Sequence, residues 1–260
     1  MSIKPGFIRT KLGGWRTKPD ASCTHASPDT AGLVKVDGNY YYPTEEWSEL
    51  DDQQQYACEC EAAALNAQDH VLIGPSAAAL HGYWVRTDPK PHVRTVPATT
   101  MAPHDYEDFH GALVEKPLPA VTTTTELDGF VPGFMAAECA VVDGDMEQKD
   151  LKSAAKQLDS PRACAHMRRI SQLADGASES AEEALFFAAM HENLSDLFTR
   201  VGEPREKVFM CRTSDKASLG RTDWCWPHLG VIVDYASPER IRSFIGESRA
   251  AATYEDCRSE

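Results

Sequence analysis

The chain has 260 residues, of which 42% are hydrophobic and 25% are charged, so it has the size and composition of a globular protein with one large or two modest domains. Its formal net charge of −14 argues against a general nucleic-acid coat, because non-specific binding to phosphates requires cations. The apolar runs are shorter than the roughly 20 residues that a bilayer requires, and no apolar stretch follows the N-terminus, so a cytoplasmic protein without a membrane partner is expected.

Residues 1–31 mix Gly, Pro, Ser and Thr with basic residues and show no apolar periodicity, which predicts an irregular arm. Its first 18 residues contain no acid and five basic residues, Lys4, Arg9, Lys11, Arg16 and Lys18. Residues 44–62, by contrast, contain seven acids and no Lys or Arg. A basic arm on an acidic body is a candidate DNA contact, although a charged terminus without a ligand has the same composition.

Two β-rich runs flank Asp37-Gly38 in GLVKVDGNYYYP, which predicts a hairpin from Leu33 to Tyr42. Thr44 is then the expected N-cap of a helix that runs to about Asn66. In HVLIGPSAAALHGYWV a short strand precedes a small helix over 76–81, with Ser76 as N-cap and Gly82 as its end.

Residues 83–123 alternate apolar and polar positions between Pro, Asp and Gly, which predicts several strands. Helical periodicity follows over 131–142, 147–157 and 161–174. An amphipathic helix is predicted over 181–198, then strands near 206–212, 220–226 and 230–235 and a polar helix from Pro238. The last part of the chain therefore has the order α-β-β-β-α.

Two carboxylates lie where predicted strands meet, Asp223 in GRTDWCWP and Asp234 in GVIVDYAS. Strands joined by a short turn place their ends side by side, so this pair is a candidate Mg²⁺ site. Glu183 on the preceding helix adds a third oxygen ligand, and such a set is typical of metal-dependent phosphodiester hydrolysis. The alternative is structural, because acids at strand ends often cap turns or pair with arginines such as Arg221.

Other reactive residue types fit a structural role better. Ser76 lies in GPSAA and not in the GxSxG pattern of serine hydrolases. The eight cysteines include no CxxC pair, and Cys58 and Cys60 point to different faces of a helix, so free thiols are expected rather than zinc or disulfides. Trp224 and Trp226 are expected on one face of a strand.

From about Leu33 to Arg240 the chain resembles an actinobacterial family related to AbiEi-type (type IV) antitoxins, with a C-terminal domain like very-short-patch-repair endonucleases. GLVKVDGNYYYP is similar to the wing of its winged helix, HVLIGPSAAALHGYW to its LSHxSAAxLHGL signature, and AVTTTTELDG and AECAVVDGDM to the strand and helix that follow. ESAEEALFF, GRTDWCWP and GVIVDYAS are similar to the nuclease-like domain.

The resemblance implies acids at Glu183, Asp223 and Asp234, with Arg240 near the place of a family lysine. The family pattern ExDG is replaced here by Asp234-Tyr235-Ala236-Ser237, so one metal-binding or catalytic position is alanine. The chain also ends soon after residue 240, where the family adds a helix and a strand, and residues 1–31 contain no recognition helix before the wing. These departures predict a degenerate nuclease site.

We therefore expect an α+β protein, with an N-terminal hairpin and helices, a β-rich middle and an incomplete restriction-endonuclease-like core. The expected parts are a basic arm (1–31), an AbiEi-like antitoxin domain (32–145), a helical connector (146–177) and an endonuclease-like domain (178–260). The expected function is an antitoxin-like protein that associates with DNA or with a toxin-like protein partner. The alternative is a Mg²⁺-dependent DNA endonuclease that uses Glu183, Asp223 and Asp234.

Overall fold

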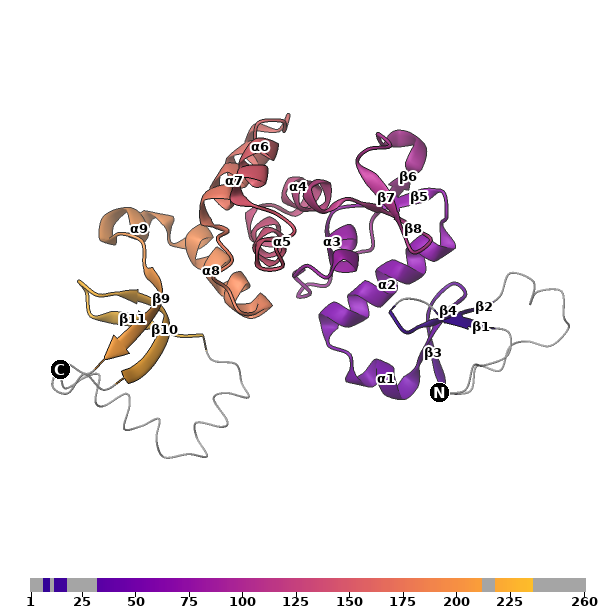
Figure 1. Cartoon of the computed structure of the whole chain (residues 1–260), viewed down its shortest axis with the longest axis horizontal. Helices are drawn as coiled ribbons and strands as arrows, with labels where there is room; N and C mark the ends of the chain where they lie inside the picture. Colours follow the sequence, from indigo (N-terminus) through magenta and orange to yellow (C-terminus); the bar gives the residue numbers. More distant parts are fainter. Residues whose placement is uncertain (1–6, 10–11, 18–31, 212–217, 236–260) are drawn as a thin grey trace, which may run out of the picture. The chain divides into compact units, whose positions relative to one another are not determined.

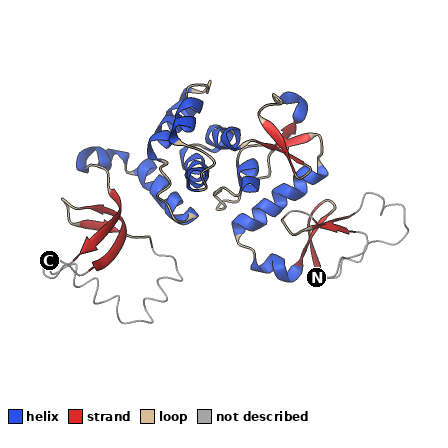
Figure 2. Ribbon diagram, viewed as in Figure 1, coloured by secondary structure: helices blue, strands red, loops and turns tan. Residues whose placement is uncertain are grey.

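The computed structural model describes residues 7–9, 12–17, 32–211 and 218–235, and contains both helices and β-sheets (Figures 1 and 2). The expected α+β class is confirmed. By the density of its internal contacts the chain divides into two compact units, Met1–Ala188 and Ala189–Glu260. In the described residues, no helix is both long enough and apolar enough to cross a membrane.

The first sheet of unit 1 is antiparallel and has the strand order β1-β2-β4-β3. The expected hairpin is confirmed as β3 (Leu33–Asp37) and β4 (Tyr40–Pro43). The prediction of an irregular arm is wrong for β1 (Phe7–Arg9) and β2 (Trp15–Thr17), which form a hairpin. β2 pairs with β4, and a strand that depends on a distant partner leaves little signal in its own three residues.

The long helix predicted from Thr44 is two helices, α1 (Thr44–Glu49) and α2 (Asp52–Asn66). Thr44 is the first residue of α1 and not its cap, because Pro43 occupies the N-cap position without a side-chain hydrogen bond. Asp51 starts the second helix through a capping box. The Asp51 Oδ1 accepts the Gln54 N–H at 2.8 Å, and the Gln54 Oε1 accepts the Asp51 N–H at 3.1 Å.

A buried carboxylate on α2 ties three segments of unit 1 together. Glu61 Oε2 accepts a hydrogen bond from the Tyr40 hydroxyl at 2.6 Å, and Glu61 Oε1 accepts one from the Leu12 N–H at 3.3 Å. Around these contacts lies a core of buried residues: Tyr40, Tyr42, Cys58, Ala62 and Leu65. Glu61 therefore joins α2 to the hairpin β3–β4 and to the segment that precedes β2.

The middle of unit 1 is a four-stranded sheet of order β6-β5-β8-β7, in which β5 and β8 are parallel and the other pairs antiparallel. Its strands are β5 (His70–Leu72), β6 (Thr95–Pro97), β7 (Tyr106–Phe109) and β8 (Ala112–Glu115). A single 3₁₀ turn, η2 (Ala98–Thr100), follows β6. The small helix α3 (Pro75–His81) ends at Gly82, whose φ of 88° is in the left-handed region that favours glycine.

The threonine run at 122–125 lies in a helix, α4 (Pro117–Asp128), and not in the strand that the resemblance implied for AVTTTTELDG. Pro117 suits the first turn of a helix. The hydroxyls of Thr122, Thr124 and Thr125 donate to the carbonyls four residues earlier, at 2.7 to 2.9 Å. These bonds satisfy the hydroxyl groups within the helix, so Thr124 and Thr125 can be buried although threonine is a poor helix former.

Three further predicted helices are confirmed as α5 (Phe130–Val142), α6 (Gln148–Ala154) and α7 (Pro161–Leu173). The single helix predicted over 181–198 is two, α8 (Ala181–Asn193) and α9 (Ser195–Val201). Leu194 separates them with φ −114° and ψ 17°. The break lets Phe198, on α9, pack its ring against His191 and Trp226, at centroid distances of 4.9 and 5.9 Å.

Unit 2 contains an antiparallel sheet of order β11-β10-β9. Its strands β9 (Arg205–Cys211), β10 (Ser218–Trp226) and β11 (Val231–Val233) confirm the three predicted strands. Trp224 and Trp226 are both buried, and the Trp226 indole N–H donates to the Gly202 carbonyl at 2.9 Å. The polar helix predicted from Pro238 lies outside the described residues.

Candidate functional site

The two candidate aspartates meet where the pairing of β10 with β11 ends. The outermost paired residues are Trp224 on β10 and Val233 on β11. Asp223 is the residue before Trp224, and Asp234 is the residue after Val233. Antiparallel pairing therefore places the two aspartates at the same edge, as the sequence predicted.

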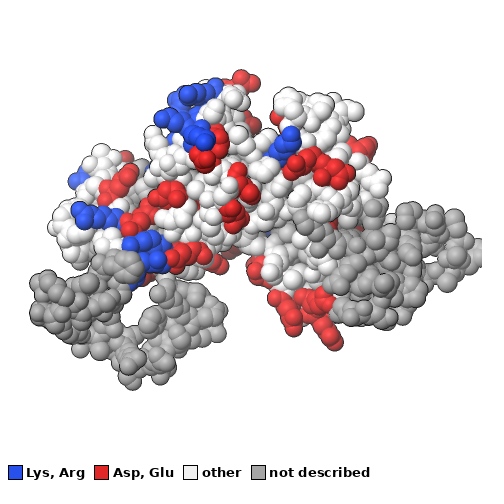
Figure 3. Space-filling model, viewed as in Figure 1, with Lys and Arg blue, Asp and Glu red and all other residues white. Residues whose placement is uncertain are grey.

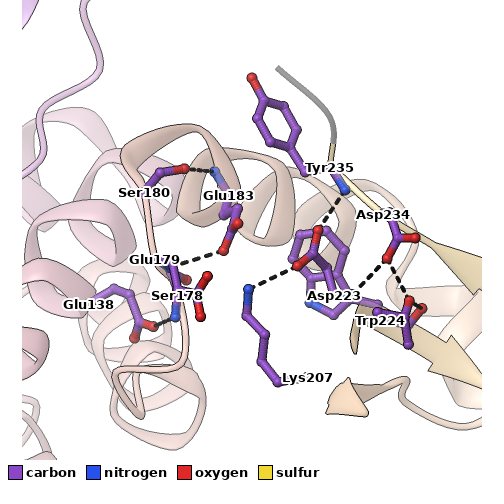
Figure 4. Close-up of polar contacts among 11 residues, drawn as sticks. Glu138, Ser178, Glu179, Ser180, Glu183, Lys207, Asp223, Trp224, Asp234 and Tyr235 are labelled. Carbon is purple, nitrogen blue, oxygen red and sulfur yellow. Dashed lines mark hydrogen bonds and ion pairs between the residues drawn. The ribbon is translucent and has the colours of Figure 1, made fainter. Parts of the chain in front are cut away.

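Each aspartate binds the backbone of the opposite segment (Figure 4). Asp234 Oδ1 accepts the Asp223 N–H at 2.8 Å and the Thr222 hydroxyl at 2.6 Å. Asp223 Oδ2 in turn accepts the Tyr235 N–H at 2.8 Å. These contacts replace backbone pairing beyond the end of β11, so both carboxylates have a structural role.

The cation beside Asp223 is Lys207, on β9. Its Nζ lies 2.9 Å from Asp223 Oδ1, and the two side chains are only 16% and 9% exposed. Lys207 has φ of 48°, an uncommon value for a residue other than glycine and a mark of local strain. Lys207 was not predicted as a site residue, because the pairing of β9 with β10 brings it to Asp223 from 16 residues away.

Arg221, which the sequence offered as a partner for the acids, is not the cation beside Asp223. Arg221 is on β10 and exposed, and Arg240 lies outside the described residues, as does Ala236. Both oxygens of Asp223 are thus used, one by an ammonium group and one by a backbone N–H.

Glu183 caps the start of α8. Its N–H donates to Ser180 Oγ at 3.2 Å, and its Oε2 accepts the Glu179 N–H at 3.0 Å (Figure 4). The Ser-x-x-Glu spacing is the capping-box signature, and it provides a structural reason for a buried glutamate at this position. Glu183 belongs to unit 1, whereas Asp223 and Asp234 belong to unit 2.

Oxygens of both Asp223 and Asp234 that could bind Mg²⁺ already have partners within the protein. The part of the chain that the structure describes has no group of three or more His, Cys, Asp or Glu side chains able to hold a metal ion. Lys207 cancels one of the two negative charges of the pair, and Mg²⁺ needs oxygen ligands in near-ideal octahedral positions. No catalytic step through a metal ion follows from this geometry.

Most of the basic residues of the arm lie outside the described residues. Arg9 and Arg16 lie in β1 and β2, whereas Lys4, Lys11 and Lys18 lie outside the described residues. The pairing of β1 with β2 joins Arg9 to Trp15 and Ile8 to Arg16 in register. The predicted DNA contact of the arm stays a prediction.

Ser76 is not the N-cap of α3, a position that Gly74 occupies. Its fully buried hydroxyl lies 2.9 Å from the Tyr56 hydroxyl and accepts the Arg94 N–H at 2.8 Å. His81, at the end of the same helix, has its Nε2 2.6 Å from the Glu115 carbonyl. Both side chains hold the middle of unit 1 together.

The buried cysteines of unit 1 are free thiols of low reactivity. Burial raises the pKa of Cys58, Cys60 and Cys139 to about 12 in each case. Because the thiolate is the nucleophile and the metal ligand, these three side chains are poor candidates for catalysis or zinc binding.

Comparison of the chain with protein-family models, with curated proteins and with solved structures gives no match.

Proposed function

We propose that the chain is an antitoxin-like binding protein that associates with DNA and is built on a nuclease-like fold without nuclease chemistry. The absence of nuclease chemistry is supported by the ion pair between Lys207 and Asp223, with the Tyr235 N–H on the second oxygen of Asp223. The antitoxin-like role and the association with DNA are proposed from the resemblance of the sequence. Asp223, one of the two side chains expected to hold the metal, is paired with a cation and has both oxygens engaged within the protein.

The order of elements from α8 to β11 supports the nuclease-like part of the proposal. Helices α8 and α9 are followed by the antiparallel strands β9, β10 and β11, as expected for a restriction-endonuclease-like core. The structural roles of the acids support the absence of nuclease activity, because Glu183 caps a helix and Asp234 binds the backbone of β10.

The second candidate is a Mg²⁺-dependent endonuclease. It is favoured by the position of Asp223 and Asp234 on neighbouring segments at one edge of a sheet, with a lysine beside them. A metal ion would have to displace Lys207 from Asp223, which costs the energy of a largely desolvated ion pair.

Cleavage and binding assays on the same preparation separate the two candidates. Supercoiled plasmid is incubated with the full chain and Mg²⁺ or Mn²⁺, and binding to a labelled duplex is measured by fluorescence anisotropy. We expect binding without cleavage. Cleavage that disappears in Asp223→Ala but persists in the control Glu107→Ala, which changes an exposed acid on β7, would establish the endonuclease and end the proposal.

A further inference from the structure

The hairpin of α6 and α7 has a basic surface within an acidic chain. Residues 147–169 contain six Lys or Arg and three Asp or Glu, a local charge of 6 − 3 = +3, whereas the whole chain carries −14. Figure 3 shows the basic side chains gathered over these two helices. We call them the α6–α7 basic face: Lys149, Lys152, Lys156, Arg162, Arg168 and Arg169.

The hairpin buries its apolar side chains and turns these cations outward. Leu151 on α6 and Met167 and Ile170 on α7 are fully buried. Lys149, Lys152 and Lys156 are exposed, and their spacing of three and four residues keeps them along one side of α6 and its C-terminal extension. Arg162 and Arg168 are exposed on α7.

Two of the six cations of the basic face have a partner among the described residues. Lys149 forms an exposed ion pair with Glu147, at 2.7 Å, which solvent screens. The Arg169 guanidinium lies 4.7 Å from the centroid of the Phe130 ring. The other four cations form no ion pair with any described residue: Lys152, Lys156, Arg162 and Arg168.

We propose that the α6–α7 basic face binds the phosphate backbone of duplex DNA. The inference rests on the proposed DNA association and assigns it a surface other than the N-terminal arm. Clustered cations repel one another, and an external polyanion that releases counterions relieves this repulsion.

The composition of the face favours duplex DNA over other polyanions. None of the exposed large apolar side chains of the described residues lies within 147–169, so a membrane has no apolar anchor and a protein partner has no apolar hot spot there. The same residues include no Phe, Trp or Tyr on which unpaired bases could stack. Polar, cationic surfaces are typical of contacts to the duplex backbone.

The test compares two full-length variants of equal charge. The face variant combines Lys152→Ala, Lys156→Ala and Arg168→Ala, and the control combines Arg86→Ala, Lys116→Ala and Arg200→Ala. Affinity for a fluorescent 24-base-pair duplex, a length of about two helical turns chosen from a repeat near 10.5 base pairs, is measured by anisotropy over a range of salt concentrations. Circular dichroism checks that both variants fold.

We expect the face variant to bind at least about 10-fold more weakly than the control at low salt, and its plot of log affinity against log salt to be shallower by about 3, since three phosphate contacts are lost. Equal affinities of the two variants would overturn the inference while the proposed DNA association stands. A third variant combines Lys4→Ala, Lys11→Ala and Lys18→Ala in the arm. If only this variant loses binding, the inference is likewise overturned and the proposed DNA association stands. A wild-type chain that binds no duplex would remove both the inference and the proposed DNA association.

Discussion

Buried carboxylates that accept backbone hydrogen bonds recur in unit 1. Glu115 Oε2 accepts the Gly74 N–H at 2.7 Å and its Oε1 accepts the Thr123 hydroxyl at 2.8 Å. Glu138 accepts the Ser178 N–H at 2.9 Å (Figure 4). It also accepts the Gly176 N–H at 3.1 Å. Desolvation by burial raises the pKa of both carboxyls despite these hydrogen bonds.

The two glutamates should respond differently to replacement by Gln. A hydroxyl can accept as well as donate, so the amide of Glu115→Gln keeps both hydrogen bonds, to Gly74 and Thr123, and removes a desolvated charge. In Glu138→Gln the amide NH₂ must face a backbone N–H, which should cost about 1 to 3 kcal/mol. We expect Glu115→Gln to be at least as stable as the wild type at pH 7, and Glu138→Gln to be less stable, by urea unfolding.

The free energy of unfolding should depend on pH through Glu115, because the pKa of this carboxyl is raised in the folded state. A carboxyl with a raised pKa in the folded state contributes stability that is complete below the unfolded pKa and is lost as pH rises through the folded pKa. The wild type should therefore lose this contribution between acidic and neutral pH, and Glu115→Gln should not. Parallel pH profiles of unfolding for the two proteins would show that Glu115 is not the group responsible.

At the scale of elements, local capping decides where helices begin. Leu50 is extended and ends α1, and the cap formed by Asp51 begins a new helix, α2. The hydrogen bond of the Glu183 N–H to Ser180 Oγ marks the beginning of α8. In both cases the signal is a short polar pattern, Asp-x-x-Gln or Ser-x-x-Glu, that is visible in the sequence.

Removing the cap of α2 should weaken unit 1. Asp51→Ala leaves the Gln54 N–H without its side-chain acceptor, and the loss of such a cap typically costs about 1 kcal/mol. The neighbouring variant Asp52→Ala removes only an exposed first-turn acid, so its effect should be a few tenths of a kcal/mol at most, roughly that of a helix-dipole contact. Equal losses in the two variants, by chemical unfolding, would contradict the capping role of Asp51.

At the scale of the whole molecule, the two units have separate sets of internal contacts. The ion pair of Lys207 with Asp223 joins β9 to β10 and lies entirely within unit 2. Loss of this ion pair should therefore lower the stability of unit 2 and leave that of unit 1 unchanged. Local differences of this kind are measurable, because amide hydrogen exchange reports the stability of separate cooperative parts.

Lys207→Ala should destabilise unit 2 by about 2 kcal/mol, since it leaves the largely buried Asp223 without its cation. Hydrogen exchange should accelerate in β9, β10 and β11 and stay unchanged in α2 to α7. Lys207→Gly should lose about 1 kcal/mol less than Lys207→Ala, because glycine adopts φ of 48° without strain.

The control for this experiment is Arg205→Ala, which removes an exposed cation from the same strand. Faster exchange of β9–β11 in both variants would mean that general charge, and not the ion pair, stabilises the sheet.

The sequence by itself determined the elements with a strong local signal. Asp37-Gly38 predicted the β3–β4 hairpin, apolar periodicity predicted α5, α6 and α7, and turn residues separated β9, β10 and β11. It also predicted that Asp223 and Asp234 lie together, because antiparallel strands joined by a short turn have their ends fixed by the turn.

Tertiary structure decided what depends on distant partners. β1 and β2 form because β4 pairs with β2, and the threonine run of α4 is a helix although its residues favour strands. The chemistry of the site was decided in the same way. Lys207 reaches Asp223 only because β9 pairs with β10, and this contact, which no local pattern encodes, changes a candidate metal ligand into half of an ion pair.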